Sequence, residues 1–178
     1  MRNLKTYENF KKNVFYRAEP EFLGEVVDFK PEGYYEAVGK DNSPIFAFDE
    51  HRVSNVAELC ASKIIGGCVM GSFSMTRSNE YYIYQIDEEP EVDISDWVGE
   101  DFEYLEEVRY RHPVKGIYIG KIILSNYQKN LFEAFYKLFE YEEIDDEDEM
   151  DEWNEKYGKY WDDIVDDKLS KEVKNIKV

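Results

Sequence analysis

The hydrophobic period of this chain changes near residue 126, and that change constrains the fold more than any single motif does. Upstream of it, short apolar runs of strand-like character are separated by glycine, proline and polar turns. Downstream, apolar residues recur every three or four positions, as they do in a helix. We therefore predict an α+β body over residues 1–125, with a mixed, mostly antiparallel sheet, followed by acidic helices over residues 126–178 that pack on it.

The body is expected to contain one helix among several strands. The helix is predicted over residues 53–66, because apolar residues recur there at helical spacing and Gly66 and Gly67 would end it. Residues 87–104 mix proline, glycine and acidic side chains, which indicates a long surface loop. The strands are predicted at residues 14–18, 44–48, 68–75, 81–86 and, as one or two strands, within 105–124, with a short segment at 25–29 between loops.

Negative charge is concentrated in one part of the chain. The net charge of the 178 residues is −18, and residues 140–167 alone hold 15 acidic side chains and two lysines. Direct binding of nucleic acid by the whole chain is disfavoured, because that affinity comes from Lys and Arg displacing counterions. An anionic membrane surface is disfavoured for the same reason. No run of 18 apolar residues and no apolar N-terminal region occurs, so we expect a cytoplasmic protein without a membrane span.

Two helical patterns occupy the C-terminal part. Leu131, Phe135 and Leu138 share one face of the first. The second is acidic and carries an aromatic stripe made of Met150, Trp153, Tyr157, Tyr160, Trp161 and Ile164. We favour packing of this stripe on the body, because a large exposed apolar patch promotes aggregation. The alternative is that its aromatic residues are anchors for a basic protein partner bound through residues 140–167.

Metal and nucleotide-hydrolysis motifs are not supported by the sequence. The only histidines, His51 and His112, are interpreted as structural, and the acidic run lacks the central glycine of a calcium loop. Residues 66–72 match the glycine and serine positions of a phosphate-binding loop but lack its lysine. Cys60 and Cys68 are predicted to be reduced and buried. We therefore expect no metal cofactor.

Several short motifs follow one another within residues 14–124. FYRA comes first, then PIFAF leading into an alanine-containing helix, then YYIYQIDEEP with an acidic loop, and finally EEVRYRHPVKGIYI. This succession resembles the ADP-ribosyltransferase fold, including its small rifamycin-modifying and toxin-type branches. The resemblance covers about 110 of the 178 residues and implies that NAD is bound as a substrate.

The resemblance assigns an arginine and a glutamate to the reaction. In that family an arginine or histidine on the first strand holds NAD, and the matching residue is Arg17, flanked by Tyr16 and Ala18. A guanidinium makes bidentate contacts with phosphate or ribose oxygens. A glutamate at the head of a late strand stabilises the positive charge on ribose, and its match is Glu107, with Glu106 on the opposite strand face. The alternative is an edge-strand position for the arginine and exposed positions for the glutamates.

The second family motif is where this sequence differs. Family members have Ser-Thr-Ser or a tyrosine in the strand before the helix, whereas this chain has Phe46 and Phe48. One of these rings could stack on nicotinamide, or both could belong to the core. Candidates for the missing hydroxyls and for a second phosphate contact are Ser72, Ser74, Thr76 and Arg77.

Two functions follow from these patterns. The first is an enzyme, possessing an ADP-ribosyltransferase or NAD-glycohydrolase activity, that transfers ADP-ribose from NAD to a macromolecular or small-molecule acceptor. The alternative is a non-enzymatic acidic protein that imitates nucleic acid or inhibits a basic partner. Either would suit an effector.

Overall fold

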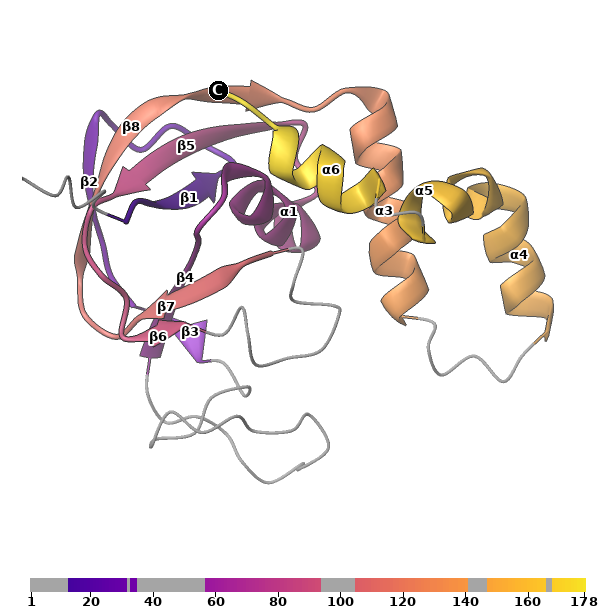
Figure 1. The fold of residues 1–178 in the computed structure, drawn as a ribbon, viewed down its shortest axis with the longest axis horizontal. Coiled ribbons are helices and arrows are strands. Elements are labelled where there is room, and N and C mark those ends of the chain that lie inside the picture. The colour runs from indigo at the N-terminus through magenta and orange to yellow at the C-terminus, as the bar shows by residue number, and fades with distance from the viewer. Residues whose placement is uncertain (1–12, 32, 35–56, 94–104, 141–146, 166–167) are drawn as a thin grey trace, which may run out of the picture.

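The protein is α+β, with one antiparallel sheet and helices gathered against one of its faces (Figure 1). The computed structural model describes residues 13–31, 33–34, 57–93, 105–140, 147–165 and 168–178. The α+β class expected from the sequence is therefore present.

The strands have a simple antiparallel order. They are β1 (Phe15–Glu19), β2 (Val26–Phe29), β3 (Gly33–Tyr34), β4 (Ala57–Ser62), β5 (Glu80–Ile86), β6 (Val92–Asp93), β7 (Glu107–Tyr110) and β8 (Val114–Ile123). Their order across the sheet is β2-β8-β5-β1-β4-β7-β6, and β3 pairs with β4 off this path. The first strand of the chain thus lies near the middle of the sheet, between β5 and β4.

The helices follow the strands in the second half of the chain, except for one. They are α1 (Ile65–Thr76), α3 (Asn126–Glu140), α4 (Glu147–Tyr157), the 3₁₀ helix η1 (Gly158–Tyr160), α5 (Trp161–Val165) and α6 (Lys168–Asn175). Figure 1 shows α6 returning from the helical end of the molecule to lie beside α1, with the C-terminus near β8. None of the helices in the described residues is long and apolar enough to cross a bilayer.

Side chains of the sheet alternate between two apolar cores. On one face, residues of the strands alone form a core that includes Phe15, Tyr84 and Val108. On the other face, Ala18 and Ile83 pack with residues of α1, α3, α5 and α6. Strand alternation sends neighbouring residues to opposite faces, so β1, β5 and β8 contribute to both cores, whereas the buried apolar residues of β2, β4 and β7 belong to the strand-only core.

The segment from residue 57 to residue 76 reverses the predicted order of helix and strand. The helix predicted over 53–66 is wrong for its described part, because residues 57–62 form β4. The strand predicted over 68–75 is wrong, because α1 covers these residues. The sequence of β4 does not show the usual alternation of exposed polar and buried apolar residues, because the charged residue Glu58 is only 1% exposed.

Gly66 and Gly67 do not end a helix but allow close packing near the start of α1. A Cβ atom on Gly66 would lie 1.0 Å from the carbonyl oxygen of Val173 in α6. One on Gly67 would lie 2.0 Å from the carbonyl oxygen of Leu105. The two glycines therefore serve helix-to-helix and helix-to-loop contact.

Other sequence predictions agree with the structure. The strands predicted at 14–18, at 81–86 and within 105–124 are confirmed by β1, β5, β7 and β8, and the short segment at 25–29 by β2. The first of the helices predicted within residues 126–178 is confirmed by α3. The two-residue strand β6 lies within the predicted loop over 87–104, of which residues 94–104 are outside the described part. The predicted strand at 44–48 also lies outside it.

The aromatic stripe of the C-terminal part is largely buried. Trp153, Tyr157, Tyr160 and Ile164 belong to the same core as residues of the sheet and α1. Trp161 is 46% exposed, and its ring meets that of Trp153 edge-on at 5.8 Å between centroids. Three of the four aromatic residues expected as partner anchors thus contribute to the core of the protein.

Candidate functional site

A pocket of about 680 Å³ opens where β1, β4, α1, α3 and the start of β7 come together. Its volume is in the range of sites that hold small molecules and cofactors. The sheet is weakly closed at this point, because the single registered pair between the described strands β1 and β4 is Tyr16 with Ser62. In contrast, β1 pairs with β5 along its whole length, from Phe15 to Glu19. The pocket therefore lies at a partial opening of the sheet.

Most of the residues that the sequence singled out line this pocket. Arg17 and Ala18 of β1, Ser74 of α1 and Glu107 of β7 are all on its wall. Of the further candidates, Ser72 and Thr76 also line it. Tyr16 is half-buried and packs instead against the core beneath the helices. Phe46 and Phe48 lie outside the described residues.

Arg17 bridges the two strands that have separated. Its Nη1 donates to the Cys60 carbonyl oxygen of β4 at 2.8 Å, and its Nε pairs with Glu19 Oε1 at 2.5 Å. The guanidinium also lies over the ring of Phe29, 5.2 Å from its centroid. The side chain is therefore held in place from three directions while still lining the pocket.

Glu107 stands at the head of β7 and is held by two donors. Its Oε1 accepts a hydrogen bond from Arg109 Nε at 2.8 Å and another from Cys60 Sγ at 2.9 Å. Glu106 is placed differently: its backbone has a left-handed φ of 43°, and its carboxylate faces Lys174 of α6 at 3.6 Å. Of the two neighbouring glutamates, Glu107 is the one on the pocket wall.

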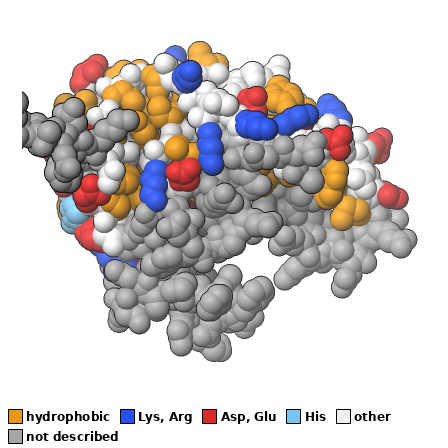
Figure 2. All heavy atoms as spheres, in the orientation of Figure 1, with side chains coloured by type: hydrophobic (Ala, Val, Ile, Leu, Met, Phe, Trp, Pro, Cys, Tyr) orange, Lys and Arg blue, Asp and Glu red, His pale blue; other side chains and the backbone are white. Residues whose placement is uncertain are grey.

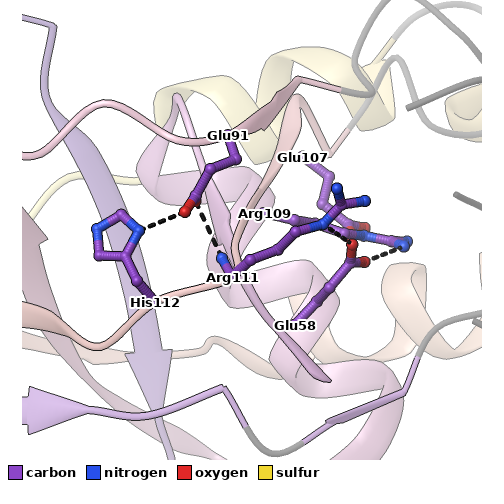
Figure 3. Close-up of polar contacts among 6 residues, drawn as sticks. All are labelled: Glu58, Glu91, Glu107, Arg109, Arg111 and His112. Carbon is purple, nitrogen blue, oxygen red and sulfur yellow. Dashed lines mark hydrogen bonds and ion pairs between the residues drawn. The ribbon is translucent and has the colours of Figure 1, made fainter. Parts of the chain in front are cut away.

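A buried network of charges lies behind Glu107 (Figure 3). Arg109 Nη1 contacts Glu58 Oε2 at 3.1 Å, and Arg111 Nε contacts Glu58 Oε1 at 2.8 Å. Burial alone would lower the pKa of Arg109, but its interactions with Glu107, Cys60 and Glu58 together outweigh burial, so that the pKa is raised above its usual value. Arg109 is therefore a permanent cation between two carboxylates.

Hydroxyl groups of the pocket donate hydrogen bonds to nearby backbone carbonyl oxygens. Ser62 Oγ donates to the Leu105 carbonyl oxygen at 2.5 Å and accepts from the Ile64 N–H at 3.1 Å. Ser74 Oγ donates to the Gly71 carbonyl oxygen at 2.7 Å. Thr76 Oγ1 donates to the Ser72 carbonyl oxygen at 2.9 Å. These contacts fix the hydroxyls in position, with oxygen lone pairs left to accept.

Two further pocket residues are held in their neutral forms. Burial raises the pKa of the Cys68 thiol, which donates to the Ile65 carbonyl oxygen at 3.1 Å. Burial likewise raises the pKa of Tyr136, whose hydroxyl donates to the Met70 carbonyl oxygen at 2.9 Å. Neither group has the character of a nucleophile, because nucleophilic attack by a thiol needs a thiolate. The reactive charge of the pocket is that of Glu107, Glu19 and Arg17.

Arg77 lies just beyond α1 and contacts aromatic rings. Its guanidinium is 5.2 Å from the centroid of Phe73 and 5.4 Å from that of Tyr136. It is not among the residues that line the pocket. Its predicted role as a second phosphate contact stays a prediction.

Ser62, Cys60 and Arg109 were missed at the sequence level. The sequence pattern predicts that residues 57–62 belong to a helix, and this prediction does not reveal that Ser62 lies opposite Glu107 and Cys60 opposite Arg109 across β4 and β7. The alternation of charged and apolar residues in EVRY is the one signal that places Arg109 and Glu107 on the same face.

The described residues contain no cluster of three or more His, Cys, Asp or Glu side chains suited to hold a metal ion. Comparison with protein families, with curated proteins and with solved structures found no match. The chemistry of the pocket residues is therefore the basis for assigning a function.

Proposed function

We propose that this protein is an NAD-dependent ADP-ribosyltransferase-like enzyme that transfers ADP-ribose to a macromolecular or small-molecule acceptor in the cytoplasm. The observation that carries the proposal is the meeting of Arg17 and Glu107 on the wall of one pocket, from strands β1 and β7 that flank β4. The two residues are 90 positions apart in sequence. The sequence resemblance assigns both residues to the reaction, and their place on one pocket wall supports that assignment.

The carboxylate suits the charge that develops in such a reaction. The bond between ribose C1′ and the nicotinamide nitrogen breaks, and its electron pair goes to the nicotinamide ring, which leaves as a neutral molecule. The sugar becomes positively charged in the transition state, and a carboxylate beside it stabilises that charge. The acceptor then forms a new bond to C1′ and loses its proton to Glu107 or to water. Water as the acceptor gives ADP-ribose, so NAD hydrolysis is the simplest form of the activity.

Arg17 is assigned to the ribose or phosphate oxygens of NAD. Among the described residues, its hydrogen bonds use Nε and Nη1, so Nη2 is the atom that we assign to the ligand. Its pairing with Glu19 balances the charge on this part of the wall, and Glu107 adds a negative charge, which suits the nicotinamide cation of the substrate. Phe46 or Phe48 stays our prediction for the ring that stacks on nicotinamide.

Ser62 supplies the hydroxyl that the family motif requires. It ends β4, the strand that directly precedes α1, and this is the place in the fold that the family motif occupies. It is in register with Glu107 on the neighbouring strand. A hydroxyl and a carboxylate side by side can both contact the ribose of a bound nucleotide.

The test is release of nicotinamide from NAD by purified protein. Glu107→Gln keeps the shape of the side chain and removes its charge, so we expect turnover to fall by about 10²–10³-fold while NAD binding changes little. Glu106→Gln is the matched control, because Glu106 is next in sequence but faces Lys174. Full activity of Glu107→Gln, or an equal loss in Glu106→Gln, would show that the assignment is wrong.

We also propose that residues 140–167 attract a basic protein acceptor. In the described part of this segment Asp151, Glu152, Glu155 and Asp162 are exposed, and Trp161 is 46% exposed beside them. Elsewhere on the face seen in Figure 2, acidic and basic side chains intermix among the described residues. If the binding of a basic protein acceptor to this segment did not weaken with added salt, an electrostatic attraction would be contradicted. If Trp161→Ala did not weaken that binding, the role of Trp161 as an aromatic anchor would be contradicted.

A further inference from the structure

We propose that Arg109 is a positioning residue that holds the Glu107 carboxylate in the pocket, and that Glu58 in turn holds Arg109. This inference deepens the proposed function and rests on it for the role of Glu107. The same network makes predictions about geometry that do not need turnover.

The contacts form a continuous chain from the pocket into the protein. Glu107 Oε1 accepts from Arg109 Nε at 2.8 Å, and Arg109 Nη1 contacts Glu58 Oε2 at 3.1 Å. Arg111 Nε contacts the other oxygen of Glu58, Oε1, at 2.8 Å. Figure 3 shows the Glu58 carboxylate between the two arginine side chains. Arg109 therefore cannot rotate away from Glu107 without breaking its contact with Glu58.

The network is carried by two rigid strands and not by loops. In the register of β4 and β7, Cys60 lies opposite Arg109 and Ser62 lies opposite Glu107. The alternate residues of β7, Val108 and Tyr110, enter the strand-only core on the other face, where neither is exposed. Because those residues fix the strand against the core, the positions of the charged side chains are fixed as well.

The burial of Arg109 indicates that this residue positions the Glu107 carboxylate and does not mainly stabilise the fold. The Arg109 side chain is 4% exposed and that of Glu58 is 0% exposed. Removing two such charges from water is costly, and apolar residues of similar size are often at least as stable in such places. An arginine buried between two carboxylates, one of which lines the pocket, thus has a role beyond packing. A guanidinium is suited to it, because its planar fork reaches both carboxylates at once, which a lysine ammonium does not.

The placement of the donors leaves part of Glu107 for a substrate. Arg109 and the Cys60 thiol both donate to Oε1. Among the described residues no hydrogen bond falls on Oε2, and the Glu107 side chain is 12% exposed. Oε1 is therefore the atom that fixes the carboxylate, and Oε2 is the atom that faces a ribose. A carboxylate displaced by about 1 Å from its productive place can cost about 10²-fold in rate.

The experiment compares Arg109→Gln with Arg111→Gln. Each substitution removes one of the two arginine contacts of the Glu58 carboxylate, but of these two arginines Arg109 is the one that contacts Glu107. For Arg109→Gln we expect kcat for nicotinamide release to fall by about 10- to 100-fold with little change in KM, because substrate binding is kept and transition-state stabilisation is lost. Arg111→Gln should keep kcat within about twofold of the wild type, because the ion pair of Arg111 in this network is with Glu58 and not with Glu107. Arg109→Lys should recover part of the loss, and it replaces Arg109→Gln if that variant fails to fold.

A second experiment uses infrared spectroscopy to report the position of the Glu107 carboxylate without requiring any enzymatic reaction. In a Cys68→Ala background Cys60 is the one thiol of the chain, and its infrared S–H stretching band reports the hydrogen bond to Glu107. We expect Arg109→Gln to move this band to higher frequency as the carboxylate leaves its place, and Arg111→Gln to leave it unchanged.

The outcomes separate the two proposals. Wild-type kcat in Arg109→Gln, an equal loss in Arg111→Gln, or an S–H band that Arg109→Gln does not move would overturn the positioning role. If the wild-type protein releases no nicotinamide at all, the proposed function is wrong, and the S–H band alone then decides whether Arg109 positions Glu107.

Discussion

Gly71 offers a direct way to close the pocket without disturbing the fold. It lies within α1 and lines the pocket, and a Cβ atom at this position would meet no atom of the described residues within 4 Å, apart from its chain neighbours and the backbone of α1 itself. The side chain of any residue placed there therefore enters open space. Gly71→Phe would direct an aromatic ring from α1 into the pocket, and Gly71→Ala would add one methyl group.

The magnitudes follow from helix propensity and from the space available. Glycine inside a helix costs about 0.5–1 kcal/mol relative to alanine, so Gly71→Ala should raise the free energy of unfolding by this amount. For a chain of this length that corresponds to a melting temperature about 1–4 °C higher. Phenylalanine is a poorer helix former than alanine, so Gly71→Phe should stay within about 1 kcal/mol of the wild type. Its ring occupies the pocket, so NAD affinity and turnover should fall at least about tenfold, which corresponds to about 1.4 kcal/mol.

The assay has two parts, urea unfolding for stability and nicotinamide release with calorimetric NAD titration for function. The expected pattern is a stable, inactive Gly71→Phe beside a stable, active Gly71→Ala. Wild-type affinity and turnover in Gly71→Phe would show that NAD does not use this pocket. A loss of more than about 2 kcal/mol in both variants would show that Gly71 does not face open space.

Two further predictions concern packing and pH. Gly66→Ala should lower the free energy of unfolding by about 3 kcal/mol or more, because its Cβ would lie 1.0 Å from the Val173 carbonyl oxygen. Gly158→Ala is the control and should not lower it, because the nearest atom found for its Cβ is 3.8 Å away. Urea unfolding measures the free energy of both variants. The hydrogen bond with Glu91 raises the pKa of His112, so this pair stabilises the fold fully below the ordinary value of about 6.5 and loses its effect as pH rises through the raised pKa. His112→Gln should flatten thermal stability between about pH 6 and 8, by a small amount because the ring is 42% exposed; an unchanged pH profile would contradict this.

Elements with a clear local period were predictable from the sequence. The strand at β5 combines aromatic and β-branched residues, and α3 has a continuous apolar face. The pocket residues Arg17 and Glu107 were found through short motifs, although the sequence gives no distance between them. That both line one pocket depends on the order of strands in the sheet, which no local pattern encodes.

The errors all involve contacts between distant parts of the chain. Glu58 is a charged residue, and its pairing with Arg109 and Arg111, more than 50 positions later, allows it to be buried in a strand. The sequence predicts a helix end at Gly66, whereas the approach of Val173 from the far end of the chain explains why a glycine is required in α1. Local sequence pattern and intrinsic propensity do not predict secondary structure where long-range contacts determine the environment of a residue.

The most direct test of the central claim is the melting temperature of the wild-type protein with and without NAD. A ligand that binds only the folded state at 100 times its dissociation constant adds about 2.7 kcal/mol of stability, which corresponds to a rise of about 5–10 °C for a chain of this size. We predict such a rise for the wild type and for Gly71→Ala, and none for Gly71→Phe. A melting temperature of the wild type that does not change in millimolar NAD would contradict the assignment of this pocket to NAD.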